Sequence, residues 1–474
     1  MIQPSLQPGP VKAPCEPRRR WAFGLTGRSV GLLIAGFFLL IPGFWDSRLS
    51  YTMLGWDALV LLAAFLDGRR LPGAAQLTAG RSWTNAPALD SETEIELTVE
   101  NHGRVLVHCR LDDDLPPALT TQTATQSVTV FPNVPATARY KIAPQERGDW
   151  DARRLYIAYR SPLGLAERWA VAPLDQRVRV YPALRTGEEQ KLFLARSRQI
   201  DLQLRQARQR GLGRDFESLR EYREGDDLRD ICWTATARRG TPITRQYQTE
   251  RSQPVWIVLD CGRLMRSQVG ALPSGHVGPV AAFAARTHSK LDFACTTAVS
   301  LAQLALYSGD RVGLLAYGQG TQQRLLPGRG ASHLRQMIES LAQVRAEGSE
   351  ADHLRATAVL NRLQPRRSLI LWITDLAETA MRPEVIDGAV QLLRRHVLLF
   401  VAMAQPEVEK IAEARPKNVE QMFRAAAAQE MAGRREVLLA RLHEQGALTL
   451  DLNPEALTST VLNQYLTVKE RAMV

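Results

Sequence analysis

The chain has 474 residues, 45% of them hydrophobic, so it is long enough for two or three domains and too apolar to be disordered as a whole. Its formal net charge of +11 comes from arginines spread among acids, without a basic block interleaved with stacking aromatics, which argues against nucleic acid as a partner. The five cysteines are widely spaced and form no CxxC or Cys/His cluster, a pattern that predicts reduced thiols rather than disulfides or a zinc site.

The N-terminal region predicts a membrane anchor. Residues 1–28 are expected to form a basic cytoplasmic tail, of which residues 1–17, with several prolines, are expected to be disordered. The apolar stretches 29–45 and 49–66 are predicted to be two transmembrane helices that form a hairpin in the lipid bilayer. A signal peptide is the alternative for the first stretch, but no small-x-small cleavage site separates it from the second. Asp57 is expected to face the partner helix or the interface.

Arginines flank this hairpin on both sides and are scarce in the link between its two stretches. The positive-inside bias therefore predicts that both ends of the hairpin lie in the cytoplasm. We expect a multi-pass protein of the inner (plasma) membrane whose soluble domains are cytoplasmic.

Residues 75–185 predict a β-sandwich. Short runs of alternating apolar and polar residues recur there, separated by Pro, Gly and Asn, and this spacing is typical of an all-β domain. The runs cover residues 92–101, 104–114, 127–131, 138–144, 153–160 and 176–182.

Residues 186–253 include a segment crowded with charges, which we expect to link the two larger domains. Eleven of its residues are predicted to form one structural network: Asp215, Phe216, Glu217, Leu219, Arg220, Tyr222, Gly225, Asp226, Arg229, Trp233 and Arg238. In this network Trp233 is expected to be a buried anchor, with Arg220, Arg229 and Arg238 paired to the acids. The alternative is a solvated, salt-bridged face.

Residues 254–474 predict a doubly wound α/β domain with C-terminal helices. Continuous apolar runs, typical of parallel strands covered on both faces, occupy 254–260, 310–318, 367–375, 396–404 and 447–452. Helical spacing occupies 279–307, 331–345, 383–395 and 416–445. Because ligands of such sheets bind beyond the carboxyl ends of the strands, Asp260 and Asp375 are expected on one rim.

The charged segment closely resembles the signature of the domain-of-unknown-function-58 (DUF58) family, G-x-G-x-[DE]-F-x-x-L-R-x-Y-x-x-G-D-x-x-R-x-I-x-W-x-x-[ST]-A-R. The chain reads GLGRDFESLREYREGDDLRDICWTATAR from residue 211. Residues 147–169, 289–318 and 463–471 also resemble segments of that family. The resemblance implies an N-terminal membrane hairpin and a von Willebrand factor A-like domain.

The von Willebrand likeness implies a rim that holds Mg²⁺ through a D-x-S-x-S motif and a second Asp. Asp260 and Asp375 match the acids, but Gly262 and Leu264 replace the two serines. The pocket at Asp260, Gly262, Leu264 and Asp375 is therefore interpreted as vestigial, and neither a bound Mg²⁺ nor another cofactor is expected. Capping of nearby backbone amides is an equally good role for the two aspartates.

The preferred hypothesis is a noncatalytic, membrane-anchored protein-interaction or assembly protein. The resemblance implies a MoxR-type AAA ATPase as its partner. The alternative is a metal-dependent hydrolase that uses the carboxylates Asp215, Glu217, Glu221, Asp226 and Asp227. Arginines near each of these acids favour ionised, structurally occupied carboxylates, and the chain has no P-loop, HExxH or GxSxG motif.

Overall fold

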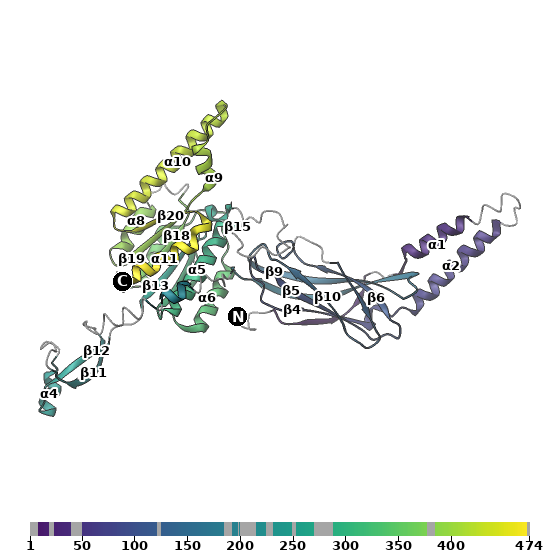
Figure 1. Cartoon of the computed structure of the whole chain (residues 1–474), viewed down its shortest axis with the longest axis horizontal. Coiled ribbons are helices and arrows are strands. Elements are labelled where there is room, and N and C mark those ends of the chain that lie inside the picture. The colour runs from purple at the N-terminus through teal and green to yellow at the C-terminus, as the bar shows by residue number, and fades with distance from the viewer. Residues whose placement is uncertain are drawn as a thin grey trace. The chain divides into compact units, whose positions relative to one another are not determined.

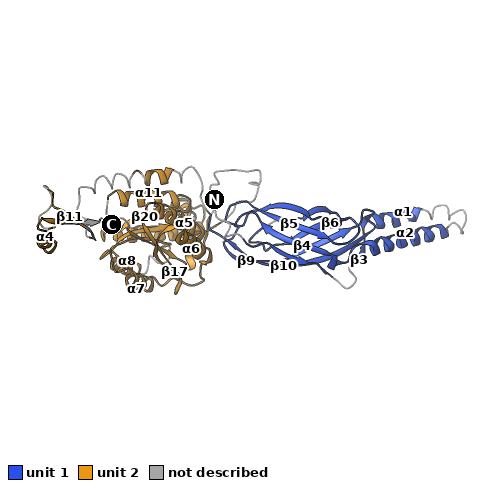
Figure 2. Cartoon of the chain, turned by 90° about the horizontal axis from the view of Figure 1, so that it is seen from below, with its two compact units in different colours: residues 1–183 blue, residues 184–474 orange. Residues whose placement is uncertain are grey.

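The computed structural model describes residues 8–18, 23–38, 50–120, 125–183, 192–197, 199, 215–223, 231–248, 253–269, 288–376 and 384–471. The chain divides into two compact units, Met1–Ala183 and Leu184–Val474, which are coloured separately in Figure 2. We call them the sandwich unit and the α/β unit.

The sandwich unit contains two antiparallel sheets around one hydrophobic core. One sheet has the order β1-β4-β5-β8; the other has the order β2-β10-β9-β6-β7, with β3 also pairing with β10. Buried and half-buried residues alternate strictly along β5, as expected for a strand with one face on the core. The strands are β1 (Val11–Pro14), β2 (Glu16–Pro17), β3 (Phe23–Leu25), β4 (Leu77–Trp83), β5 (Thr93–Asn101), β6 (Val107–Asp114), β7 (Thr125–Val130), β8 (Ala136–Ile142), β9 (Gly148–Arg160) and β10 (Ala166–Val180).

A buried ion pair joins the two sheets inside this core. Arg81 on β4 donates to Asp113 on β6, and the Tyr140 hydroxyl on β8 donates to Asp113 Oδ2 at 2.5 Å. Arg81 Nη1 also donates to the carbonyls of Ala152 and Leu174, at 3.1 and 3.2 Å. The pair is therefore hydrogen-bonded on both sides, which offsets the cost of taking its charges out of water.

The prediction that residues 1–17 are disordered is wrong for residues 11–14 and 16–17, and residues 23–25 of the basic tail also form a strand. These residues form β1, β2 and β3, which pair with β4 and β10. Cys15, between β1 and β2, is only 2% exposed in the sandwich core. Sheet edges supply unpaired backbone donors and acceptors, so a short segment without its own apolar pattern is ordered by pairing with them.

The region of the predicted transmembrane hairpin contains two helices that pack together, one of them long enough to span a membrane. Helix α1 (Gly27–Phe37) packs against α2 (Ser50–Arg70), and the Trp56 indole of α2 donates to the Leu32 carbonyl of α1 at 2.9 Å. Residues 39–49 lie outside the described part of the chain. Within that part, one helix, Tyr51–Arg70, is long and apolar enough to cross a membrane, with a mean hydropathy of 1.3. At 1.5 Å per residue its 20 residues span about 30 Å.

The bases of both helices are tied to one turn of the sandwich, residues 161–165. Asp67 of α2, 2% exposed, accepts from the Ser161 hydroxyl at 2.6 Å and from the amides of Leu165 and Ala166. Ser29 of α1 donates to the Leu165 carbonyl at 2.8 Å. These buried bonds connect the helix pair to the sheet.

The α/β unit contains a six-stranded sheet with the order β17-β16-β13-β18-β19-β20. All neighbours in it are parallel except β17, which pairs antiparallel with β16 at one edge. The predicted strands are confirmed to within two residues, whereas β17 was missed because its residues are polar and half-exposed. The strands are β13 (Pro254–Asp260), β16 (Arg311–Tyr317), β17 (Thr321–Gly328), β18 (Leu369–Thr374), β19 (Val397–Met403) and β20 (Leu448–Leu452).

Helices cover both faces of this sheet. On one face α7, α8 and the C-terminal half of α10 pack over Trp256, Trp372 and Phe400. Helices α5 and α11 pack on each other, and Figure 2 shows α11 and α7 on opposite sides of the sheet. The helices are α5 (Lys290–Tyr307), α6 (Gly330–Gln343), α7 (His353–Leu363), α8 (Glu384–Leu393), α9 (Pro406–Glu413), α10 (Val419–Glu444) and α11 (Leu457–Glu470). Short strands β14 (Gln268–Val269) and β15 (His288–Ser289) precede α5.

The signature segment forms a hairpin with a short helix. Strand β11 (Asp215–Glu221) pairs antiparallel with β12 (Ile243–Gln248), and α4 (Trp233–Arg239) lies between them in sequence (Figure 1). Gly240 ends α4 in the left-handed conformation, φ 74°, that glycine tolerates best. The hairpin belongs to the same compact unit as the six-stranded sheet.

Candidate functional site

Polar side chains gather where the parallel strands of the α/β sheet end, as the doubly wound topology requires. Asp260 ends β13, Thr374 ends β18 and is followed by Asp375, and Gln405 follows β19. We use "the rim" for seven residues at this edge: Asp260, Lys290, Thr374, Asp375, Gln405, Arg435 and Asp451.

Asp260 is 4% exposed, and both of its carboxylate oxygens accept hydrogen bonds. The Gly262 amide donates to Oδ1 at 2.7 Å, and the Thr374 hydroxyl donates to Oδ2 at 2.6 Å. Burial raises the pKa of this carboxyl, while nearby His353 and the two hydrogen bonds oppose that rise. The prediction that the aspartates cap backbone amides is confirmed for Asp260.

Asp375 is fully buried and lies against a buried lysine. Lys290, the first residue of α5, places its Nζ 2.5 Å from Asp375 Oδ2. Gln405 donates to the same oxygen at 3.1 Å, and Arg435 Nη1 lies 3.8 Å from Oδ1. Burial lowers the pKa of the Lys290 ammonium, and the Asp375 carboxylate opposes that change.

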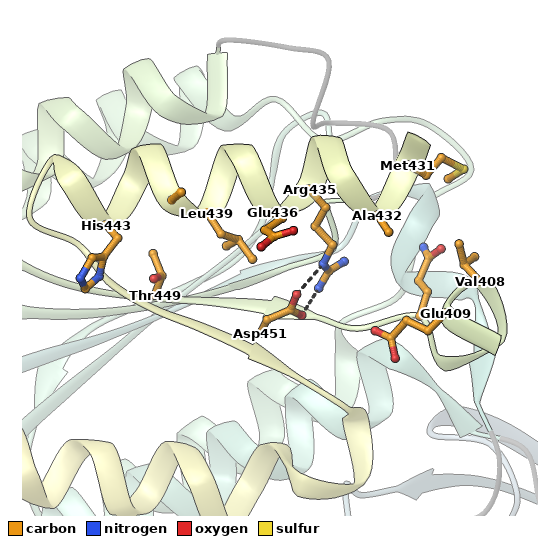
Figure 3. Close-up of a pocket in the computed structure, with 12 residues that line it drawn as sticks. Val408, Glu409, Met431, Ala432, Arg435, Glu436, Leu439, His443, Thr449 and Asp451 are labelled. Atoms are coloured by element: carbon orange, nitrogen blue, oxygen red, sulfur yellow. Dashed lines mark hydrogen bonds and ion pairs between the residues drawn. The ribbon is translucent and has the colours of Figure 1, made fainter. Parts of the chain in front are cut away.

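Arg435 connects the rim to the long helix α10. It makes two hydrogen bonds to Asp451 on β20, from Nε at 3.0 Å and from Nη2 at 2.5 Å (Figure 3). This two-pronged geometry is the strongest that arginine and a carboxylate form. The pair lines a cavity of about 510 Å³ between α9, α10 and β20, into which Glu409, Met431 and His443 also project.

A chain of buried aromatic groups lies close to Asp260. The Trp372 indole donates to the Tyr317 hydroxyl at 2.7 Å, and that hydroxyl lies 2.9 Å from His353 Nδ1. Burial, reinforced by Asp260, raises the pKa of Tyr317 well above its ordinary range. The Tyr317 phenol therefore stays protonated and orients the His353 ring.

The residues of the vestigial pocket do not fit a divalent cation. Both Asp260 oxygens already have donors, and Lys290 occupies Asp375. Gly262 is buried, and a Cβ built there would lie 2.9 Å from the Ala351 amide nitrogen, too close for a serine without backbone movement. Leu264 offers no oxygen. In the described ranges, no three His, Cys, Asp or Glu side chains converge as a metal site would need.

The described residues include only part of the predicted signature network. Leu219, Arg220, Glu221 and Tyr222 lie on or just after β11, and Arg220 donates to the Glu221 carbonyl at 3.2 Å. Asp215, Phe216 and Glu217 lie on β11, and Trp233 and Arg238 lie on α4. Gly225, Asp226, Asp227 and Arg229 lie outside the described residues.

The prediction that Trp233 is a buried anchor is wrong, because its side chain is 70% exposed. The buried positions next to α4 are Ile231, Cys232, Ile243 and Thr244, and Ile231 pairs with Thr244 of β12 through an isolated β-bridge. Seven residues make only about two turns of helix, and none of the seven is buried; Ala235 and Thr236 are half-buried and Trp233 is exposed.

Sequence reasoning found two rim residues and missed the other five. Thr374, Gln405 and Asp451 could have been found, because each lies at or next to the carboxyl end of a predicted strand. Lys290 carried no such signal, because the helix predicted over 279–307 placed it in the interior; the observed helix begins at Lys290, where a positive charge is electrostatically unfavourable and needs a partner. Arg435 carried none, since a mid-helix arginine is usually a surface residue.

Residues 218–421 match the model of a family described as "Protein of unknown function DUF58". Uncharacterized proteins of Mycobacterium bovis and Mycobacterium tuberculosis are each 26% identical over 200 residues, which cover 41% of this chain and 56% of theirs. The chain thus spans about half the length of the curated relatives it matches.

Two solved structures show a distant likeness. The conserved hypothetical protein BatB from Bacteroides thetaiotaomicron is 14% identical, with 46% of this chain and 100% of that chain covered and a TM-score of 0.28. An uncharacterized membrane spanning protein from Vibrio fischeri is 13% identical, with 45% and 96% covered and a TM-score of 0.18. TM-scores this low do not establish a common fold. The family match is the specific finding: the chain contains a DUF58 domain, which spans residues 218–421.

Proposed function

We propose that the protein is a membrane-anchored, noncatalytic interaction protein whose cytoplasmic α/β domain is von Willebrand factor A-like and docks a protein partner. The observation that carries this proposal is the exposure of Trp233, at 70%, within the family signature. Tryptophan is enriched at protein interfaces relative to the rest of the surface, and with tyrosine and arginine it is among the residue types most enriched at their energetic centres.

The anchor rests on α2 and on the strands that flank the helix pair. Strands β1 to β3 precede α1, β4 to β10 follow α2, and they share the same two sheets. Chain segments that pair in one sheet lie on one side of a bilayer. The arginines that flank the helices favour the cytoplasmic side.

The von Willebrand likeness is supported by topology. If the six strands are numbered by their place in the chain, their order across the sheet is 3-2-1-4-5-6. The third strand, β17, lies at one edge and is antiparallel to its neighbour. This is the order of doubly wound sheets, which carry ligand sites at the carboxyl rim.

A noncatalytic role is supported by the way the rim charges are used. Each of its three carboxylates accepts from a neighbouring side chain or amide, so the rim is occupied by contacts within the domain. A general acid or base needs to reach a substrate proton instead. The signature resemblance supports a MoxR-type AAA ATPase as the partner.

The test is co-purification of a MoxR-type ATPase from detergent-solubilised membranes with the wild type, Trp233→Ala and Phe131→Ala. Phe131 is the matched control, an aromatic side chain 55% exposed in the sandwich unit. We expect Trp233→Ala to weaken capture about 30-fold, as loss of a 2 kcal/mol hot spot would, without lowering Tm. Phe131→Ala should bind like the wild type. Equal capture by all three proteins would contradict the proposed docking site.

A further inference from the structure

Lys290 lies where a lysine is least expected. It is the first residue of α5, and its side chain is only 2% exposed. Lysine is almost never fully buried unless paired, and the N-terminus of a helix disfavours positive charge. Ser289 caps this helix and Asp292 completes a capping box, so the helix start is satisfied without Lys290. The ammonium group therefore contributes to the electrostatics of the rim and not to the capping of the helix.

The surroundings of the ammonium are those of a bound cation. Asp375, fully buried, lies 2.5 Å away, and Gln405 holds the same carboxylate from β19. Asp260 is the second buried acid of the rim, and the nearby Asp375 carboxylate disfavours the charged form of Asp260 and so raises its pKa. Two buried carboxylates at the same edge of the sheet require a positive charge nearby.

We propose that the Lys290 ammonium, 2.5 Å from Asp375 and closer to it than the Arg435 guanidinium at 3.8 Å, stands where a von Willebrand-type rim would hold a divalent ion. It neutralises Asp375 within the fold, so the unmodified domain takes up no Mg²⁺ at this edge. Contacts made at the rim are then independent of metal. The inference rests on the rim itself and does not require the proposed partner.

The simplest way to restore a metal site would be to introduce serine at position 262, but the structure favours a change at Lys290 instead. Introducing serine at position 262 would bring a Cβ to 2.9 Å from a backbone nitrogen, whereas shortening Lys290 removes the competing cation and leaves the backbone unchanged. Lys290→Ala is therefore the informative change. It leaves Asp375 buried without its ammonium partner, and a divalent cation can compensate that charge.

The experiment follows Tm of the detergent-solubilised full chain in EDTA, millimolar Mg²⁺ and millimolar Mn²⁺. For the wild type we expect no difference among the three conditions. For Lys290→Ala we expect a lower Tm in EDTA that rises by several degrees with Mn²⁺, because a ligand that binds only the folded state stabilises it. Lys290→Ala/Asp375→Asn should lose this response. Arg263→Ala, which removes an exposed neighbouring charge, should behave like the wild type and serves as the control.

Two results would overturn the proposal. One is a rise of the wild-type Tm with Mg²⁺ that Asp375→Asn abolishes, since the unmodified rim would then hold the ion itself. The other is a folded Lys290→Ala variant that ignores both cations. If Lys290→Ala does not fold, Mn²⁺ titration of the wild type followed by electron paramagnetic resonance decides, because saturable binding lost in Asp375→Asn contradicts the proposal.

Discussion

Several titratable side chains of the α/β unit are buried, and their surroundings determine how each responds to pH. Burial raises the pKa of Asp310 even though Tyr465 and Lys469 donate to it, at 2.6 and 3.3 Å. Burial lowers the pKa of His396, with Arg395 adding to the effect. His396 is 4% exposed and lies 2.9 Å from the Ser368 hydroxyl through Nδ1, while its Nε2 has no hydrogen-bond partner among the described residues.

Because the pKa of His396 is lowered in the folded protein, we expect the free energy of unfolding to fall in mild acid. Its folded pKa lies below the unfolded value of about 6.5, so the unfolded chain takes up the proton first. The contribution of His396 is therefore fully present above about pH 6.5 and is lost as the pH falls through that value toward the folded pKa. We expect His396→Gln to flatten the pH dependence of the unfolding free energy by at most about 1.4 kcal/mol per pH unit.

Urea unfolding between about pH 7 and about pH 5 measures this dependence. The matched control is His443→Gln, since His443 is exposed on α10. Identical pH profiles for the two variants would show that His396 is not the group responsible.

At the scale of single elements, the helix pair of the sandwich unit depends on one small residue. A Cβ added to Gly36 of α1 would lie 2.5 Å from Trp56 Cδ1 and 2.8 Å from Asp57 Oδ1 of α2. A Cβ added to Gly31, one and a half turns earlier, would meet nothing within 4 Å. Glycine at position 36 therefore allows the two helices to approach closely, as small residues do in membrane helix pairs.

This contact predicts different outcomes for two similar substitutions. Gly36→Leu should destabilise the α1–α2 pair by about 1–3 kcal/mol through overpacking and should disrupt the Trp56 to Leu32 bond. Gly31→Leu should leave the pair close to wild type. Thermal unfolding of both variants in detergent, followed by tryptophan fluorescence, provides the comparison, and equal melting temperatures would argue against close packing at Gly36.

For the whole molecule, the proposed membrane topology makes a prediction that rests on pairing between segments far apart in sequence. Because β1 pairs with β4 and β3 pairs with β10, the residues before α1 and those after α2 belong to common sheets. A single crossing of the membrane between them would separate paired strands. This argument from structure is independent of the arginine pattern.

Reporter fusions at the N-terminus and after Gly73 should therefore report the same side, and the flanking arginines predict that this side, together with the C-terminus, is cytoplasmic. A fluorescent protein should be bright at each position, and alkaline phosphatase should be inactive. Phosphatase activity at every position would show that the orientation is the opposite of the one predicted. Activity at only one of the N-terminal and Gly73 fusions would contradict the pairing of β1 to β3 with β4 and β10.

The sequence by itself determined the elements that carry strong hydrophobic patterns. Continuous apolar runs predicted β13, β16, β18, β19 and β20, because strands covered on both faces must be apolar along their whole length. The signature predicted the family whose model matches residues 218–421, and strand ends placed Asp260 and Asp375 on one rim. Polar edge strands such as β1 and β17 were missed, since backbone pairing to a neighbour orders them without any apolar period.

Tertiary structure alone decided what the charged and aromatic residues do. Trp233 could have been a buried anchor or a surface contact, and only the packing of α4 on β12 left it 70% exposed. Lys290 and Asp375 are 85 residues apart in the chain, and only the folded sheet brings them to 2.5 Å. Hydrophobic periodicity is a local property that a sequence displays directly. The partner of a buried charge depends on contacts between distant segments, so it emerges only when the sheet has formed.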